Sequence, residues 1–255
     1  MEFIDTHSHL YLENFENDLK EVVERCKINK VNKVLLPNID VKSIEQIKNL
    51  VALDNNMFYA MMGLHQTSVD ENYKESLDTI LENDNLTDIC AIGEIGLDYY
   101  WSTEYKEQQI EAFQFQIDFA KERKLPIAIH CRNAFDDILN ILEKNFDENL
   151  KGVLHCFTGN EEQAKRLIDM NFYLGLGGVL TYKNSGLDKV IEKIDLKHLI
   201  LETDAPYLSP TPFRGKRNES SYTIYVAEKL AQIKEKSLAE VASQTTLNAK
   251  QLFNI

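Results

Sequence analysis

Eight short apolar runs, separated by longer amphipathic segments, constrain the fold of this chain more than any other feature. Strands that are buried on both faces, as in parallel sheets, read as continuous apolar runs of this kind. The predicted strands are Phe3–Thr6, Val31–Pro37, Met57–Gly63, Ile89–Gly93, Ile127–His130, Gly152–His155, Phe172–Leu176 and Leu199–Glu202.

The segments between these runs carry apolar residues at the i, i+3, i+4 and i+7 spacing of amphipathic helices. In Val41–Leu53, for example, Ile44, Ile47 and Leu50 fall on one face. The predicted helices are Glu16–Asn29, Val41–Leu53, Thr103–Lys124, Asn133–Asn145, Glu161–Met170, Leu187–Ile194, Ser220–Glu235 and a final helix, Ser237–Phe253.

Alternating strands and helices in 255 residues predict one α/β domain over residues 1–255, a (β/α)8 or TIM barrel of parallel strands with an extra C-terminal helix. A doubly wound open sheet is the alternative. Such a sheet usually has a Gly-rich G-x-G-x-x-G turn after its first strand. Here Asp5-Thr6-His7-Ser8-His9 follows the first strand instead, which favours the barrel.

Composition and charge exclude several classes of protein. The net charge of −13 argues against a broad basic surface that wraps duplex nucleic acid. No apolar run reaches the roughly 18 residues of a membrane-spanning helix, and the opening MEFIDTHSHL lacks the pattern of a secretory signal. The four scattered cysteines read as free thiols. We therefore expect a cytoplasmic protein with no membrane contact, and no obligate protein partner is evident.

Most of the histidines lie at or just after the C-terminal ends of predicted strands. In a barrel these ends meet at one face, where the active sites of such enzymes lie. We therefore expect side chains far apart in the sequence to gather in one cup. His198 precedes its strand and is expected on the opposite face. The five histidines at strand ends are His7, His9, His65, His130 and His155.

Four of these histidines and two carboxylates are the candidate metal ligands. A lone histidine is more often a core residue, but six such side chains at strand ends favour a metal site. Imidazoles with carboxylates suit Zn, Mn, Co or Ni better than Ca. Six ligands are too many for one tetrahedral ion with an open position, so we expect two ions. The candidates are His7, His9, Glu94, His130, His155 and Asp204.

Catalytic roles follow from this arrangement of ligands. Two ions about 3.5–4 Å apart are used by enzymes that hydrolyse phosphate esters. Glu94 is the expected bridging carboxylate, and Asp204 is the expected partner of the nucleophilic water. His7 and His9 are two residues apart, so that both imidazoles point the same way from an extended backbone.

A short basic cluster in this acidic chain follows the eighth strand, on the expected active face. Arg214, Lys216 and Arg217 are candidate phosphate contacts. The alternative is a solvated loop with salt bridges to Glu202 or Glu219.

Other residues near the strand ends are further candidates for substrate contacts. His65 and Arg132 are placed to reach a substrate on the same face. Tyr99, Tyr100 and Trp101 either stack on the bases of a single strand or cap the rim of the barrel, and the sequence leaves both interpretations open.

Several motifs together resemble the TatD family of metal-dependent deoxyribonucleases, from Met1 to Phe253. The resemblance implies a TIM barrel of the amidohydrolase superfamily, a magnesium- or zinc-type divalent requirement and hydrolysis of DNA phosphodiesters, often from the 3′ end. It also implies the same six metal ligands. The motifs are Thr6-His7-Ser8-His9, Gly93-Glu94-Ile95-Gly96-Leu97-Asp98, His155-Cys156-Phe157-Thr158-Gly159, Glu202-Thr203-Asp204-Ala205-Pro206-Tyr207-Leu208 and Arg214-Gly215-Lys216-Arg217-Asn218-Glu219.

Two positions depart from the family pattern. Gln66 stands where the family usually has proline after Gly-x-His, and Ser220 stands where proline usually follows the Arg-Gly-Lys-Arg-Asn-Glu run. Both concern the shape of loops at the substrate rim rather than the metal site.

We therefore expect a deoxyribonuclease with two divalent ions (Zn, Mn or Mg) that acts as a 3′–5′ exonuclease on single-stranded DNA or frayed ends. A related amidohydrolase acting on a small ester, lactone or amide, including aminoacyl deacylation, is one alternative. Many such enzymes bridge their metals with a carboxylated lysine at strand four, a place that Glu94 occupies here. A non-catalytic metal-binding scaffold is the other alternative.

Overall fold

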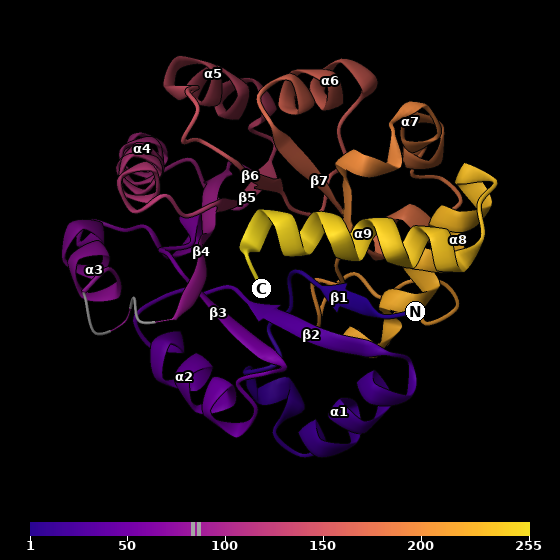
Figure 1. Cartoon of the computed structure of the whole chain (residues 1–255). Coiled ribbons are helices and arrows are strands. Elements are labelled where there is room, and N and C mark those ends of the chain that lie inside the picture. The colour runs from indigo at the N-terminus through magenta and orange to yellow at the C-terminus, as the bar shows by residue number, and fades with distance from the viewer. Residues whose placement is uncertain (83–84, 86–87) are drawn as a thin grey trace.

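A computed structural model describes residues 1–82, 85 and 88–255 of the chain. One eight-stranded sheet forms its centre, with parallel neighbours in the order of the chain (Figure 1). Its edges meet where the Thr6 N–H donates to the carbonyl of Leu201 (3.0 Å), which confirms the predicted (β/α)8 barrel. The strands are β1 (Phe3–Asp5), β2 (Val31–Leu36), β3 (Phe58–Met62), β4 (Ile89–Asp98), β5 (Ile127–Arg132), β6 (Gly152–Leu154), β7 (Phe172–Leu176) and β8 (Leu199–Leu201).

The helices surround the sheet, and the last one crosses an end of the barrel (Figure 1). Two helix starts are encoded locally, because Asn160 with Gln163 and Ser237 with Glu240 form capping boxes at the starts of α6 and α9. The helices are α1 (Leu19–Ile28), α2 (Ser43–Leu53), α3 (Tyr73–Ile80), α4 (Lys106–Arg123), α5 (Phe135–Asn145), α6 (Glu161–Asp169), α7 (Leu187–Lys193), α8 (Thr223–Lys234) and α9 (Leu238–Phe253).

The helix α3 is absent from the predicted helices. It buries Tyr73, Leu77 and Ile80. These residues have helical i, i+4 and i+7 spacing, but polar and acidic residues fill the rest of this short segment, so the apolar signal is weak. The other helices lie within the predicted ranges, most of them one to three residues shorter at either end.

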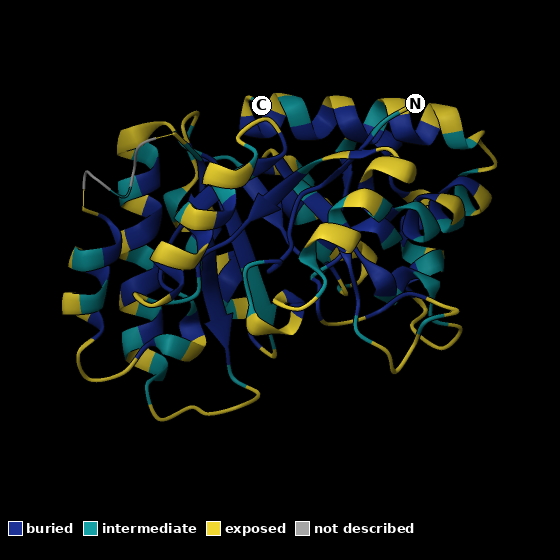
Figure 2. Cartoon of the chain, turned by 90° about the horizontal axis from the view of Figure 1, so that it is seen from below, coloured by how far each residue is buried: buried dark blue, intermediate teal, exposed yellow. Residues whose placement is uncertain are grey.

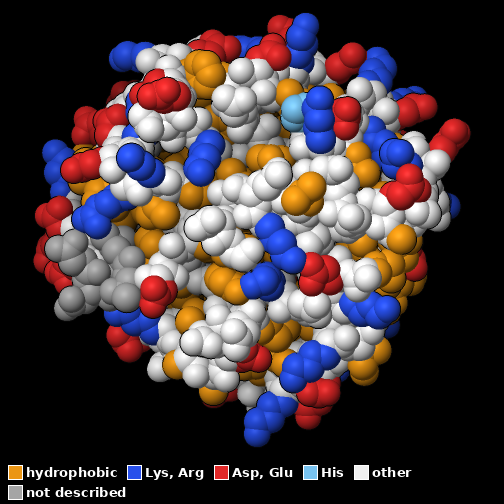
Figure 3. All heavy atoms as spheres, in the orientation of Figure 1, with side chains coloured by type: hydrophobic (Ala, Val, Ile, Leu, Met, Phe, Trp, Pro, Cys, Tyr) orange, Lys and Arg blue, Asp and Glu red, His pale blue; other side chains and the backbone are white. Residues whose placement is uncertain are grey.

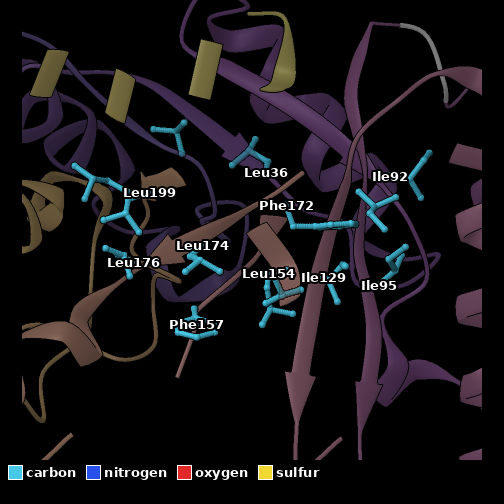
Figure 4. Close-up of a cluster of buried hydrophobic side chains, with 14 of the residues drawn as sticks. Leu36, Ile92, Ile95, Ile129, Leu154, Phe157, Phe172, Leu174, Leu176 and Leu199 are labelled. Carbon is cyan, nitrogen blue, oxygen red and sulfur yellow. The ribbon is translucent and has the colours of Figure 1, made fainter. Parts of the chain in front are cut away.

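Strand residues alternate between two cores, as the two-residue period of a strand requires. Leu36, Ile129 and Leu154 belong to the larger core, part of which Figure 4 shows. Their neighbours Leu35, Ala128 and Val153 join a smaller core that α9 closes with Ala249, Leu252 and Phe253. The final helix therefore plugs one end of the barrel.

The end covered by α9 is the end at which the strands begin. In Figure 2 the strands run away from α9, and exposed loops gather at the far end. The face that carries α9 has acidic and basic side chains interspersed (Figure 3). His198 precedes β8 and lines a hollow there together with α9, as expected for the face opposite the candidate site. Among the described residues, no helix is both long and apolar enough to cross a membrane.

Candidate metal centre

The six predicted ligands converge at the C-terminal ends of the strands. Their nitrogen and oxygen atoms form three overlapping groups, within each of which all the atoms lie within 4.8 Å of one another. His65, predicted as a substrate contact, belongs to one of these groups. The groups are His7 with His155 and Asp204, His7 with His9 and Glu94, and His65 with Glu94 and His130.

The two-residue period of the strands aims several of these side chains into the barrel. Ala128, Val153 and Ile200 belong to the inner core. Two residues further along the chain lie His130 on β5, His155 after β6 and Glu202 after β8. By the same period, these side chains point inward as well.

Glu94 reaches the same cup because β4 is irregular. Ile92 and Ile95 both belong to the outer core although they are three residues apart, and the register between β4 and β5 shifts between them. The shift breaks the alternation and turns Glu94 inward. The predicted strand end at Gly93 is therefore wrong, since β4 continues to Asp98. Gly96 permits this continuation because a Cβ atom there would collide with the carbonyl oxygen of His130.

The two carboxylate oxygens of Glu94 face different histidines. Oε2 lies 3.0 Å from Nε2 of His7 and 3.6 Å from Nε2 of His9. Oε1 lies 2.9 Å from Nδ1 of His130 and 3.0 Å from Nε2 of His155. The Oδ1 atom of Asp204 lies on the same side as His7 and His9, 3.5 Å from Nε2 of His9.

In His9 and His130, the ring nitrogen that points away from Glu94 (the outer nitrogen) is hydrogen-bonded to a polar neighbour. The Tyr11 hydroxyl donates to the carbonyl of Pro37 (2.7 Å), so it accepts a hydrogen bond from Nδ1 of His9 (2.8 Å). Asp98 accepts from Nε2 of His130 (3.0 Å). These bonds assign the protons to the outer nitrogens and leave the inner nitrogens with free lone pairs, as in metal-binding histidines.

Glu202 faces the outer nitrogen of His155 at a longer distance. The Glu202 Oε1 atom lies 3.5 Å from Nδ1 of His155 and also accepts the backbone N–H of Cys156. The inner Nε2 atom of His155 lies 3.4 Å from Nδ1 of His130.

His65 differs from the other four histidines. Its Nδ1 atom accepts the backbone N–H of Thr67 (3.3 Å), and its Nε2 atom accepts the side-chain amide N–H of Gln66 (2.6 Å). That Nε2 atom lies 3.3 Å from Oε1 of Glu94. Both ring nitrogens of His65 are therefore engaged by residues of its own loop, which sets it apart from His9 and His130.

The carboxylates of the cluster are held in the ionised form. Burial raises the pKa of Glu94, but the neighbouring charges of His155, His65 and His7 outweigh burial and hold the pKa well below its usual value. Burial also raises the pKa of Asp204, and the hydrogen bond from His9 and the nearby imidazoles bring it below its usual value.

These residues fit divalent cations. The inner nitrogens of His130 and His155 lie close to each other and to an ionised carboxylate, an arrangement that a cation between them stabilises. Two ligand atoms about 2.1 Å from one ion lie about 3.0 to 3.4 Å apart, close to the separations given above. Burial lowers the pKa of His155, yet Glu94 and Glu202 raise it well above its usual value, so the local field favours positive charge.

Backbone contacts between the ends of β1 and β8 complete the cup. The Asp204 N–H donates to the carbonyl of His7 (2.9 Å), and the His9 N–H donates to the carbonyl of Ala205 (2.7 Å). The Thr203 hydroxyl donates to buried Asp5 (2.6 Å). Ligands that are almost 200 residues apart in the sequence are thereby held on adjacent strands.

The predicted substrate contacts occupy different surroundings. The guanidinium carbon of Arg132 lies 3.6 Å from the ring centroid of Tyr100 and 5.2 Å from that of Trp101, and both rings are exposed. Tyr99 instead packs against the core and donates to Asp137 (2.8 Å). Of the two interpretations that the sequence left open, capping of the barrel rim therefore applies to Tyr99. The rings of Tyr100 and Trp101 face solvent.

The three basic residues of the cluster after β8 also lie in different surroundings. Arg214 stacks on the ring of Tyr182 (4.0 Å), and Lys216 is exposed. Arg217 is occupied by an ion pair with Asp18 (2.6 Å) and by the carbonyl of Asn14, far along the sequence. This geometry does not favour a substrate contact for Arg217, which stays a prediction. The expected salt bridge of this loop to Glu219 is long, since Arg217 lies 4.0 Å from Glu219, whose closer partner is Arg25 of α1 (2.7 Å).

Sequence reasoning missed the residues that support the ligands. Glu202 lies two residues before Asp204 and two after inward-facing Ile200, so the period of the strand alone identifies it. Asp98 and Tyr11 carry no such signal. Asn38 is also missed, although its backbone N–H donates to the carbonyl of Gly93 (3.0 Å) and its own carbonyl accepts the Glu94 N–H (3.1 Å).

Comparisons with known proteins agree with this architecture. A family described as TatD related DNase matches residues 4–254. The chain is 44% identical over 252 residues to YabD of Bacillus subtilis (strain 168), named an uncharacterized metal-dependent hydrolase, covering 98% of each chain. It is 33% identical to the similarly named YcfH of Escherichia coli (strain K12), covering 100% of this chain and 97% of YcfH.

Solved structures share the fold. The crystal structure of YjjV, a TatD homologue from Escherichia coli K12, matches with a TM-score of 0.90 and 29% identity over 99% of this chain and 98% of that one. An amidohydrolase from Saccharomyces cerevisiae matches with a TM-score of 0.80 and 21% identity over 99% and 100%, which shows the fold alone. The family match and the buried cluster lead to one conclusion: this chain belongs to the TatD family of metal-dependent hydrolases.

Proposed function

We propose that this protein hydrolyses phosphodiester bonds of DNA with two divalent ions, acting as a 3′–5′ exonuclease on single strands or frayed ends. The observation that carries the proposal is the division of ligands around Glu94, whose two oxygens face two separate sets of imidazoles. Membership of a family described as TatD related DNase supports DNA as the substrate class.

The division supports two ion positions rather than one. His7, His9 and Asp204 would hold one ion together with Oε2 of Glu94. His130 and His155 would hold the other together with Oε1. Zn, Mn and Mg are the candidate ions, since imidazole suits Zn and carboxylate suits Mn and Mg.

The residues of the cluster have distinct roles in hydrolysis. Two bound divalent ions lower the pKa of water and offset negative charge on the phosphate. Asp204 accepts the proton of the attacking water, because its low pKa keeps it ionised and its side chain is 14% exposed. Arg132, at the rim, donates to phosphate oxygens whose charge grows in the transition state.

The surroundings favour the end of a single strand over intact duplex. The cluster is buried at the bottom of a cup, where the Glu94 side chain is only 3% exposed. A net charge of −13 leaves little basic surface for a duplex. Exposed Tyr100 and Trp101 beside Arg132 offer flat surfaces on which unpaired bases stack.

Release of nucleotides from end-labelled single-stranded DNA tests this proposal. The purified protein is assayed with chelator and then with added Mg, Mn or Zn, with the label at the 5′ or the 3′ end. We expect metal-dependent shortening from the 3′ end. Shortening from the 5′ end would overturn the polarity but not the nuclease activity.

A panel of small substrates serves as the counter-test. Protein that carries two ions by mass spectrometry but cleaves no DNA with any of these metals would contradict the proposal. Hydrolysis of a lactone, an amide or an aminoacyl ester by the same preparation would then assign it to small-molecule amidohydrolase chemistry.

A further inference from the structure

A hollow of about 580 Å³ lies between the loop after β7 and the loop after β8, apart from the metal ligands. A volume of this size is typical of sites for small molecules and exceeds that of a single ion. In Figure 1 the helices α7 and α8, which follow these two loops, are neighbours. The lining residues are Val179, Tyr182, Lys183, Asn184, Ser185, Thr211 and Arg214.

Two cations of this pocket have no acidic partner among the residues that the structure describes. Arg214 contacts the face of the Tyr182 ring, and Lys183 is exposed. The contrast with other arginines is clear, because Arg166 pairs with Glu143 (2.8 Å) and Arg217 pairs with Asp18. In a chain of net charge −13, unpaired cations that share one concave surface attract an anion.

The walls of the pocket are tied to each other. The Thr211 N–H donates to the hydroxyl of Thr181 (2.8 Å), and the Tyr182 hydroxyl donates to the carbonyl of Ser209 (3.0 Å). Gly178 has no room for a side chain because the carbonyl oxygen of Leu208 lies against it. The aromatic ring under Arg214 is therefore held in place before any ligand binds, which lowers the cost of binding.

The pocket adjoins the metal centre. The segment after β8 includes Asp204 and continues through Tyr207, whose ring lies 6.2 Å from that of His9, to Thr211 and Arg214 in the pocket. On the other side, the carbonyl of Gly175 in β7, the strand before this loop, accepts the backbone N–H of Phe157, two residues after His155 (2.9 Å). Loops after the seventh and eighth strands of TIM barrels frequently bind phosphate.

We propose that this pocket binds a phosphate group of the substrate strand other than the one that is cleaved, with Lys183 and Arg214 as its cationic ligands. The inference rests on the proposed phosphodiesterase function and adds a second anion subsite to it. A substrate that spans the metal centre and the pocket gains two charged contacts, whereas a substrate with a single phosphate gains none of them. Affinity for the substrate therefore depends on its length.

Lys183→Gln tests the subsite, with Lys189→Gln as the matched control. Lys189 is an exposed lysine of α7 outside the pocket, so both changes remove one positive charge from the same region. KM is measured for single-stranded oligonucleotides of increasing length and for bis(p-nitrophenyl) phosphate, which has one phosphate. We expect Lys183→Gln to raise KM about tenfold for oligonucleotides relative to bis(p-nitrophenyl) phosphate, with kcat preserved.

A second readout is the dependence of oligonucleotide affinity on salt. Loss of one phosphate contact reduces the slope of log affinity against log salt by about one, and Lys189→Gln should retain the wild-type slope. An equal KM ratio in wild type and Lys183→Gln, or an equal effect of Lys189→Gln, would overturn the subsite.

The subsite and the proposed function can fail separately. If wild-type protein hydrolyses neither substrate, the proposed function fails, and fluorescence anisotropy with a labelled oligonucleotide then decides on the subsite. Weaker binding by Lys183→Gln alone would support it. Equal binding by all three proteins, or no binding by any of them, would refute it.

Discussion

At the scale of single residues, the candidate site is defined by where protons lie. Tyr11 and Asp98 hold the outer nitrogens of His9 and His130, and the inner lone pairs turn toward Glu94. Both ring nitrogens of His65 are instead engaged by its loop neighbours Gln66 and Thr67. Imidazoles that look alike in the sequence thus differ in the hydrogen bonds that hold them.

Asp204→Asn tests the role of this side chain as proton acceptor. An amide of the same shape keeps the fold but accepts no proton, so we expect turnover of single-stranded DNA to fall about 10²- to 10⁴-fold. The measurement is kcat together with the circular dichroism spectrum and the metal content. Near-normal kcat in a folded, metal-loaded variant would exclude Asp204 as the base.

Asp18 gives a pH dependence of stability away from the metal centre. The hydrogen bond from Arg217, assisted by Arg25, lowers the pKa of Asp18 below its ordinary value of 3.8. Ionised Asp18 therefore stabilises the folded state above about pH 4, and the contribution is lost as the pH falls through the lowered pKa. Because the pair is partly exposed, we expect Asp18→Asn to cost about 0.5 to 1 kcal/mol at pH 7.

Urea unfolding at a series of pH values measures this contribution. The difference between wild type and Asp18→Asn should shrink as the pH is lowered toward 3. Glu16→Gln, which removes a nearby exposed charge, is the control and should change stability little. A difference for Asp18→Asn that is constant with pH would show that its carboxyl is not linked to folding.

At the scale of elements, one irregular strand and one added helix shape the site and its support. The shift of register in β4 turns Glu94 into the barrel, where it meets ligands from four other strands. The final helix α9 closes the opposite end with Leu252 and Phe253, packed on the inner residues of the strands. The inner core is small, so much of its apolar contact depends on α9.

Leu252→Ala should therefore destabilise the fold strongly. The side chain is 3% exposed and packs inside the barrel end, so its truncation leaves a cavity that costs about 2 to 5 kcal/mol. Gln251→Ala, on the exposed side of the same helix, should change stability by less than about 0.5 kcal/mol. Chemical denaturation measures both, and equal effects would show that α9 does not close a packed core.

At the scale of the whole molecule, the ligands tie the barrel together. They come from β4, β5 and the segments after β1, β6 and β8, so that bound ions link both halves of the chain. Because an ion binds these residues only when the barrel has formed, its binding free energy adds to the stability of the fold.

Removal of metal should thus lower thermal stability. At an ion concentration of about 100 times Kd the stabilisation is about 2.7 kcal/mol, which corresponds to a Tm change of about 5 to 10 °C for a chain of this size. Scanning calorimetry with and without chelator measures this shift. The double variant His7→Ala with His9→Ala should lose one ion by mass spectrometry and show a smaller shift, and an unchanged metal count would contradict the ligand set.

The sequence by itself determined the barrel and the identity of the candidate ligands. Apolar runs and helical spacing are short-range patterns, because burial of one face repeats every two or every 3.6 residues. A histidine at the end of a run then has a known place, because all strands of a parallel barrel end on the same face. These steps need no knowledge of how distant segments touch.

The tertiary structure alone decided the details that set the chemistry. The turn of Glu94 into the barrel depends on a register shift between β4 and β5, and the proton positions depend on Tyr11 and Asp98. Arg217 pairs with Asp18, 199 residues away, while Arg214, three residues before it, has no such partner among the described residues. Contacts of this kind are set by the packing of distant segments, and no local pattern in the sequence records them.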